Sequence, residues 1–88
     1  MTCRVQLTRS ARQALENGLP EAAAVACWEF LRGPLAENPH RVGSALRNEP
    51  QGRYSARRGD FRVIYQINDD QVVVSVINIR HRRGVYRR

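Results

Sequence analysis

The chain has 88 residues, 42% of them hydrophobic and 26% charged. This composition is typical of a soluble globular protein, and we expect a single domain over residues 1–88. The longest apolar run, residues 22–28, is too short to span a membrane, and the N-terminus lacks the apolar stretch of an export signal. Cys3 and Cys27 are too few for a disulfide framework and lack the spacing of metal ligands. We therefore expect a cytoplasmic protein with no metal and no cofactor.

Charge is the most informative feature of the composition. The chain carries 15 basic and eight acidic residues, a formal net charge of +7, and every basic residue is arginine. The excess is uneven, because nine of the arginines but only three of the acids lie in residues 53–88. This asymmetry exceeds what solubility requires and is typical of a protein that contacts a polyanion. The C-terminal half is therefore where we expect the functional site.

The N-terminal half predicts a strand followed by a helix. Residues 3–7 have the pattern of a short strand, and Thr8 or Ser10 is a candidate N-cap for the helix after it. Apolar residues then recur at helical spacing as far as Leu19, and Asn17-Gly18 ends this first helix.

A second helix is expected from Pro20 to about Leu31. Because it is apolar on nearly all sides, it should be covered both by a sheet and by the first helix, with which it forms an antiparallel hairpin. Trp28 and Phe30 are expected in the core or in a groove for a partner. Gly33-Pro34 breaks the helical pattern, and residues 38–52 are expected to be a loop with a short strand near Leu46.

After Gly52 the hydrophobic period changes to two, which predicts three strands at residues 54–58, 61–68 and 72–79. Two-residue turns at Gly59-Asp60 and Asp69-Asp70 would join them into an antiparallel meander. The expected fold is α+β, with the N-terminal strand, the helix hairpin and then the meander. The helices would cover one face of a four-stranded sheet.

The turns determine which side chains share a face of the sheet. A two-residue turn at Asp69-Asp70 places one apolar set under the helices, namely Phe61, Val63, Tyr65, Ile67, Val72, Val74 and Val76. A two-residue turn at Gly59-Asp60 places Arg57 directly opposite Arg62 on the other face, and Ser55 opposite Ile64. Two arginines in this position repel each other unless an anion lies between them, so the pair predicts an anion-binding surface.

The same residues resemble the central signature of the RelE/ParE toxin superfamily. A basic strand, Tyr54-Ser55-Ala56-Arg57-Arg58, is followed by Gly59-Asp60-Phe61-Arg62-Val63-Ile64-Tyr65. The upstream Leu35…Asn38-Pro39…Leu46-Arg47 and the ending Ile79-Arg80-His81-Arg82-Arg83-Gly84-Val85-Tyr86-Arg87 are similar to the family too. The likeness covers almost the whole chain, and its order of elements agrees with the expected fold.

The resemblance implies the toxin of a type II toxin–antitoxin system, with a RelB-like antitoxin as its partner. Toxins of the RelE branch enter the ribosomal A site and cut messenger RNA there without a metal. The ribose 2′-hydroxyl attacks the adjacent phosphate and expels the 5′-oxygen. This reaction requires a base, an acid and positive charge near the phosphorus.

Carried onto this sequence, the family motif implies four catalytic residues: Arg57, Arg62, Arg82 and Tyr86. Some branches of the family use a C-terminal histidine as well, which makes His81 a fifth candidate. Arg62 and Arg82 would hold the scissile phosphate by bidentate hydrogen bonds. RelE-type sites often carry two lysines on the first strand, where this chain has Ser55 and Arg57. Since arginine stays protonated, the candidate bases are Tyr86 and His81, histidine being a side chain that titrates near neutral pH. Contacts to the surrounding RNA are expected from Ser55, Arg58, Arg80 and Arg83.

Three other functions remain open at this stage. ParE-type toxins share the scaffold but inhibit DNA gyrase, and the serine at position 55 favours that branch. A non-catalytic RNA-binding module is suggested by the likeness of residues 58–65 to an RNP1 strand, although Asp60 stands where RNP1 has an aromatic residue. A degenerate toxin that binds only its antitoxin is the third alternative.

Overall fold

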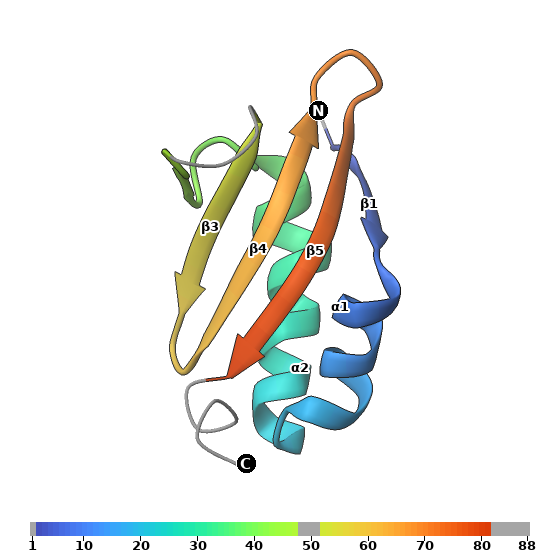
Figure 1. The fold of residues 1–88 in the computed structure, drawn as a ribbon, viewed down its shortest axis with the longest axis vertical. Coiled ribbons are helices and arrows are strands. Elements are labelled where there is room, and N and C mark those ends of the chain that lie inside the picture. The colour runs from blue at the N-terminus through green and yellow to red at the C-terminus, as the bar shows by residue number, and fades with distance from the viewer. Residues whose placement is uncertain (1, 48–51, 82–88) are drawn as a thin grey trace.

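The computed structural model describes residues 2–47 and 52–81, and in them two helical segments pack on one face of a five-stranded sheet (Figure 1). In chain order the elements are β1 (Arg4–Leu7), α1 (Arg9–Gln13), η1 (Ala14–Gly18), α2 (Glu21–Phe30), η2 (Leu31–Leu35), β2 (Ser44–Ala45), β3 (Arg53–Arg58), β4 (Phe61–Asn68) and β5 (Val73–His81). The expected α+β fold is confirmed. None of the described helices is both long and apolar enough to cross a lipid bilayer.

The sheet is mixed and has one strand more than the four expected. Its order is β1-β5-β4-β3-β2, with β1 parallel to β5 and the other neighbours antiparallel. The additional strand, β2, lies next to the expected position near Leu46 and pairs Ser44 with Ser55. Gly43 precedes it, and a β-carbon there would lie 2.7 Å from the Ser55 carbonyl oxygen. Only glycine lets the chain approach β3 this closely.

Both helical segments begin near the expected residues but continue as wider π-helical turns. Thr8 is the N-cap of α1, and its hydroxyl accepts a 3.1 Å hydrogen bond from the Ala11 amide. The second segment begins after Pro20 and does not end at Gly33-Pro34, which corrects that expectation. Proline lacks the amide hydrogen that an α-helix requires, and here the π-helical turn η2 accommodates it.

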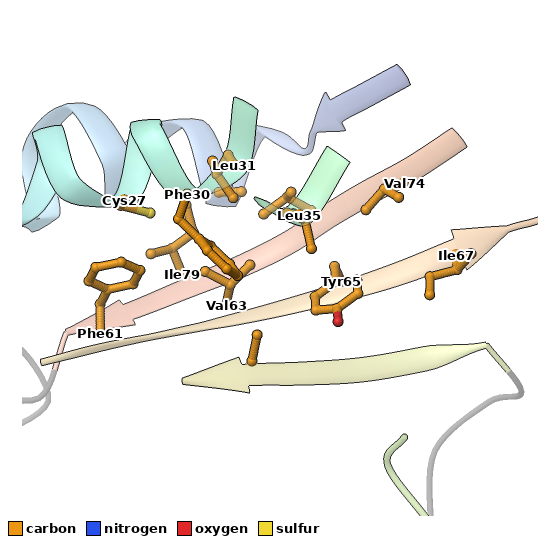
Figure 2. Packing of buried hydrophobic residues seen from close by; sticks show 13 residues of the cluster. Cys27, Phe30, Leu31, Leu35, Phe61, Val63, Tyr65, Ile67, Val74 and Ile79 are labelled. Carbon is orange, nitrogen blue, oxygen red and sulfur yellow. The ribbon is translucent and has the colours of Figure 1, made fainter. Parts of the chain in front are cut away.

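The core lies between the second helical segment and the inward face of the sheet (Figure 2). The fully or almost fully buried residues include Cys27, Phe30, Leu31 and Leu35 from α2 and η2, with Phe61, Val63, Tyr65 and Ile67 from β4 and Val74, Val76 and Ile79 from β5. Burial alternates along β4, as the period of two predicted. Trp28, by contrast, is 46% exposed, so only Phe30 of that pair lies in the core.

The turn between β4 and β5 is longer than expected but keeps the predicted faces. Asn68 pairs with Val73, so the connection has four residues, Asp69 to Val72, instead of two. An even change in length preserves which side chains face inward. Val72 itself belongs to the turn and not to the strand, which corrects its expected place in the core. Its φ of 56° is unusual for a β-branched residue.

A β-bulge in β5 decides which residues near the end of that strand face outward. Tyr65 pairs with Val76, whereas the preceding Ile64 pairs with Asn78, so Ile77 is an extra residue on β5. Strict alternation from Val76 would turn Asn78 and every second residue after it toward the helices. The bulge reverses this alternation beyond Ile77. It therefore turns Ile79 into the core and Asn78 toward the opposite face.

Candidate nucleic-acid interface

Three arginines lie side by side across neighbouring strands at one end of the sheet. Arg57 on β3 pairs with Arg62 on β4, as predicted, and Arg62 pairs with Arg80 on β5. All three are exposed, and their immediate neighbours Ala56, Val63 and Ile79 are buried beneath the helices. The three guanidinium groups therefore leave the same face of the sheet, from strands spaced about 5 Å apart. We call this set the arginine row.

The arginine row is not neutralised by an acidic side chain on the described strands. The outward positions of the described strands carry arginines, amides, hydroxyls and aliphatic side chains, but no carboxylate. Over residues 2–47 and 52–81, none of the three guanidinium groups forms an ion pair. Like charges directly opposite each other destabilise a sheet. Such a row is a surface to which an anion binds favourably.

Two further rows of side chains extend the same face toward the other end of the sheet. Next to the arginine row, Ser55, Ile64 and Asn78 pair across β3, β4 and β5. The row after that consists of Arg53, Gln66, Ser75 and, on β1, Gln6. In it, the Arg53 Nη2 donates a 3.3 Å hydrogen bond to the Gln66 Oε1. No described helix covers this face, which is the one nearest the viewer in Figure 1.

Two predicted site residues lie on the other face of the sheet. The Arg58 guanidinium carbon lies 4.9 Å from the centre of the Phe30 ring, so this arginine stacks on helix α2. His81 pairs with the buried Phe61 and is itself only 7% exposed. Alternation explains both positions, because Arg58 follows Arg57 by one residue and His81 follows Arg80 by one. Ser55, in contrast, shares the face of the arginine row.

Three of the predicted site residues belong to the C-terminal end of the chain. Arg82, Arg83 and Tyr86 lie outside the described residues. In the described part of the chain, no three His, Cys, Asp or Glu side chains gather as metal ligands. The arrangement that can be described is therefore a set of cationic and hydrogen-bonding side chains suited to a phosphate backbone.

Two buried groups can be set aside as nucleophile or base. Burial raises the pKa of the Cys27 thiol to about 11, so this cysteine is a protonated core residue near neutral pH. Burial, and to a smaller extent the neighbouring Tyr54, raises the pKa of Tyr65 to about 12. The Tyr65 hydroxyl donates a 2.6 Å hydrogen bond to the Pro39 carbonyl oxygen. Both groups serve the core and not the surface.

A polar cluster at the opposite end of the sheet was not predicted. The His40 Nε2 lies 3.0 Å from the Asp69 Oδ1, and the His40 Nδ1 lies 3.0 Å from the Tyr54 hydroxyl. Because a carboxylate only accepts, Nε2 carries the hydrogen and a neutral His40 accepts from Tyr54 at Nδ1. The Tyr54 ring stacks on Tyr65, with 5.7 Å between ring centres. We call His40, Tyr54 and Asp69 the histidine cluster. No sequence motif signals it, since 29 residues separate His40 from Asp69.

The comparisons with known proteins agree with this fold. The family model described as the ParE toxin of the type II toxin–antitoxin system parDE matches residues 5–86, and the chain belongs to this family. It is thus a member of the RelE/ParE superfamily, as its sequence motifs predicted.

Its relatives include toxins of the RelE type. The chain is 49% identical to Toxin RelE of Mycobacterium tuberculosis over 83 aligned residues. These residues cover 94% of this chain and 84% of that protein. It is 42% identical over 84 residues to Toxin RelG of the same organism, covering 96% and 95% respectively. Its fold is similar to a chain of the RelBE2 toxin–antitoxin complex of M. tuberculosis. That similarity has a TM-score of 0.87 at 39% identity and covers 93% of this chain and 100% of that one.

Proposed function

We propose that the chain is the toxin of a type II toxin–antitoxin pair and cleaves messenger RNA in the A site of cytoplasmic ribosomes. The observation that carries this proposal is the arginine row of Arg57, Arg62 and Arg80, exposed and without compensating carboxylates in the described strands. The similarity to Toxin RelE and Toxin RelG supports the RelE branch of the family.

The proposed reaction requires a base, an acid and hydrogen-bond donors to the phosphate oxygens. The 2′-hydroxyl of a ribose attacks the adjacent phosphorus while a base removes its proton. The bond from phosphorus to the 5′-oxygen then breaks, an acid protonates that oxygen, and a 2′,3′-cyclic phosphate remains. Negative charge grows on the non-bridging oxygens in the transition state, where guanidinium donors stabilise it most.

The position of each side chain relative to the arginine row suggests which part of the RNA it would contact. Arg62 lies at the centre, with a neighbouring arginine on each side, and would hold the scissile phosphate together with Arg82. Arg57 and Arg80 would contact the same or the adjacent phosphate. Ser55, in the next row, would contact the sugar.

The assignment of the base depends on the faces of the sheet. His81 points to the helix-covered side, and the backbone of β5 separates it from a phosphate bound on the arginine row. Its burial argues against direct contact with the substrate and favours a role in positioning the end of β5. Tyr86 is therefore the proposed base, and Arg83 a proposed contact to the RNA. Arg58, stacked on Phe30, would act only indirectly.

A RelB-like antitoxin is the proposed protein partner. Acidic antitoxin side chains would neutralise the arginine row, while apolar ones would cover α2, where Val25 and Trp28 are 57% and 46% exposed. A largely apolar hollow of about 530 Å³ lies between α2 and the turn joining β3 to β4. It is lined by Ala26, Glu29, Phe30, Gly33, Pro34, Arg58, Gly59 and Phe61. Both features suit an amphipathic antitoxin segment.

Inhibition of DNA gyrase is the second candidate function, because the matching family model is that of ParE toxins. The arginine row would then contact DNA or an acidic surface of gyrase, and no bond in RNA would be cut.

The two candidates are separated by inducing the toxin and mapping the ends of ribosome-bound transcripts. We expect new ends inside translated codons, absent from Arg62→Ala and present with the exposed helical control Arg12→Ala. Intact messages together with trapped gyrase–DNA complexes would overturn the ribonuclease and support the gyrase inhibitor.

A further inference from the structure

The row beside the arginines combines an aliphatic side chain with hydrogen-bonding groups. Ile64 lies at its centre, partly exposed on the outward face, with Ser55 on one flank and Asn78 on the other. An aliphatic residue in the middle of an otherwise polar strand face offers an apolar contact surface of limited size. We call Ser55, Ile64 and Asn78 the central row.

The side chains that flank Ile64 have unused hydrogen-bonding capacity. Over residues 2–47 and 52–81, neither the Ser55 hydroxyl nor the Asn78 carboxamide forms a hydrogen bond with the protein. By contrast, the Gln66 carboxamide in the following row accepts from Arg53. A carboxamide can donate and accept at once, so Asn78 is free to recognise a ligand that offers both kinds of group.

The distance between the two rows suits a nucleotide. Residues two apart on a strand lie about 6.6–6.8 Å apart, so the central row lies roughly that far from the arginine row. One ribose separates a nucleobase from its phosphate. A nucleotide whose phosphate is held by Arg62 and Arg80 can therefore place its base over Ile64, with an edge toward Asn78.

We infer that the central row is a nucleobase subsite in which Ile64 packs on the base and Asn78 selects it. Carboxamides pair best with adenine, donating to N7 and accepting from the exocyclic amine, and unstacked RNA bases are read along such edges. The preferred ligand is therefore an adenine adjacent to the cut. This inference rests on the proposed ribonuclease function and adds base selection to it.

The bulge in β5 is what makes the subsite possible. If strict alternation continued through Ile77 without the bulge, Asn78 would share the face of the buried Val76 and could not reach an RNA. The same irregularity turns Arg80 outward, so one backbone feature supplies both a phosphate contact and a base contact.

The test compares Asn78→Ala with Ser75→Ala, a matched control on the same strand and outward face. Each substitution is made in the full-length chain. After expression, the bases next to the cuts in ribosome-bound messages are counted. We expect the wild type and Ser75→Ala to favour adenine and Asn78→Ala to lose about tenfold or more of that preference while still cutting, since bidentate base contacts contribute discrimination of this size.

Three outcomes are distinguishable. An unchanged base distribution in Asn78→Ala, with cutting retained, would overturn the subsite and leave the ribonuclease intact. Absence of cuts in the wild type would overturn both. Ile64→Ala provides a second variant, in which cutting should fall at every sequence without a change in preference. A shift of base preference in Ile64→Ala but not in Asn78→Ala would contradict the assignment of selection to Asn78.

Discussion

The two ends of the sheet differ in whether their polar and charged side chains have partners within the protein. At one end Arg57, Arg62 and Arg80 stand side by side without a partner carboxylate among the described strands. At the other, His40 joins Tyr54 and Asp69 by two hydrogen bonds of 3.0 Å. Side chains that hydrogen-bond to one another stabilise the fold. A row of like charges destabilises it until an anion binds. The comparison therefore separates a structural end from a binding end.

After the complete loss of cutting expected for Arg62→Ala, the largest effect comes from changing one arginine of the adjacent pair on β3. Arg57→Ala should lower cutting on the ribosome about 100-fold, in the range found when one donor to a transition-state oxygen is lost. Arg58→Ala, one residue further on the same strand, should cut nearly as well as the wild type, because its side chain faces Phe30. The measurement is the rate at which ribosome-bound messages are cut. Equal losses in the two variants would contradict the assignment of faces.

The next effect concerns stability at the structural end. Tyr65→Phe leaves the Pro39 carbonyl oxygen without its donor in a buried site, which should lower the free energy of unfolding by about 1–2 kcal/mol. Denaturant titration measures it, with Tyr54→Phe as the control that loses only an exposed hydrogen bond. If Tyr54→Phe were the more damaging change, the core would not depend on Tyr65 as described.

A smaller effect is expected for the histidine cluster itself. His40→Ala removes both of its hydrogen bonds, and because His40 and Asp69 are largely exposed, the loss of unfolding free energy should be about 1 kcal/mol or less. Cutting should not change. A fall in cutting comparable to that of Arg57→Ala, with the fold intact, would place function at this end too.

The effect that is smallest near neutral pH is a pH dependence that comes from the core. Burial raises the pKa of Cys27 to about 11 from 9.0, so the folded state binds the thiol proton more tightly than the unfolded chain. The contribution of Cys27 to stability is therefore complete below pH 9 and is lost as the pH rises toward 11. Between pH 8 and 11, the free energy of unfolding should decline less steeply with pH for Cys27→Ala than for Cys3→Ala. Parallel declines would mean that Cys27 does not carry the effect.

The strongly patterned parts of the sequence predicted the fold well. Alternation along residues 61–68 identified the inward face, and the short Gly59-Asp60 turn placed Arg57 opposite Arg62, both of which the structure confirms. The turn at Asp69 is two residues longer than predicted. The predicted inward face is nevertheless correct, because two extra residues leave the alternation unchanged.

What the sequence could not predict depends on irregular backbone and on distant contacts. The bulge at Ile77 has no signature in a run of apolar residues, yet it turns Arg80 toward the arginine row. The second helical segment continues through Pro34 because the turn there, η2, is π-helical. Helix propensities do not predict such a turn. The hydrogen bond from His40 to Asp69 joins a loop to a turn across the end of the sheet, and only the tertiary fold brings them together.

The most direct test measures stability and cutting together in Arg62→Ala. If the arginine row is built for an external phosphate, removing its central charge relieves repulsion. Unfolding free energy should then stay the same or rise by up to about 1 kcal/mol, while cutting is lost. A variant that unfolds more easily but still cuts messages at the wild-type rate would mean that Arg62 supports the fold and that RNA is bound elsewhere.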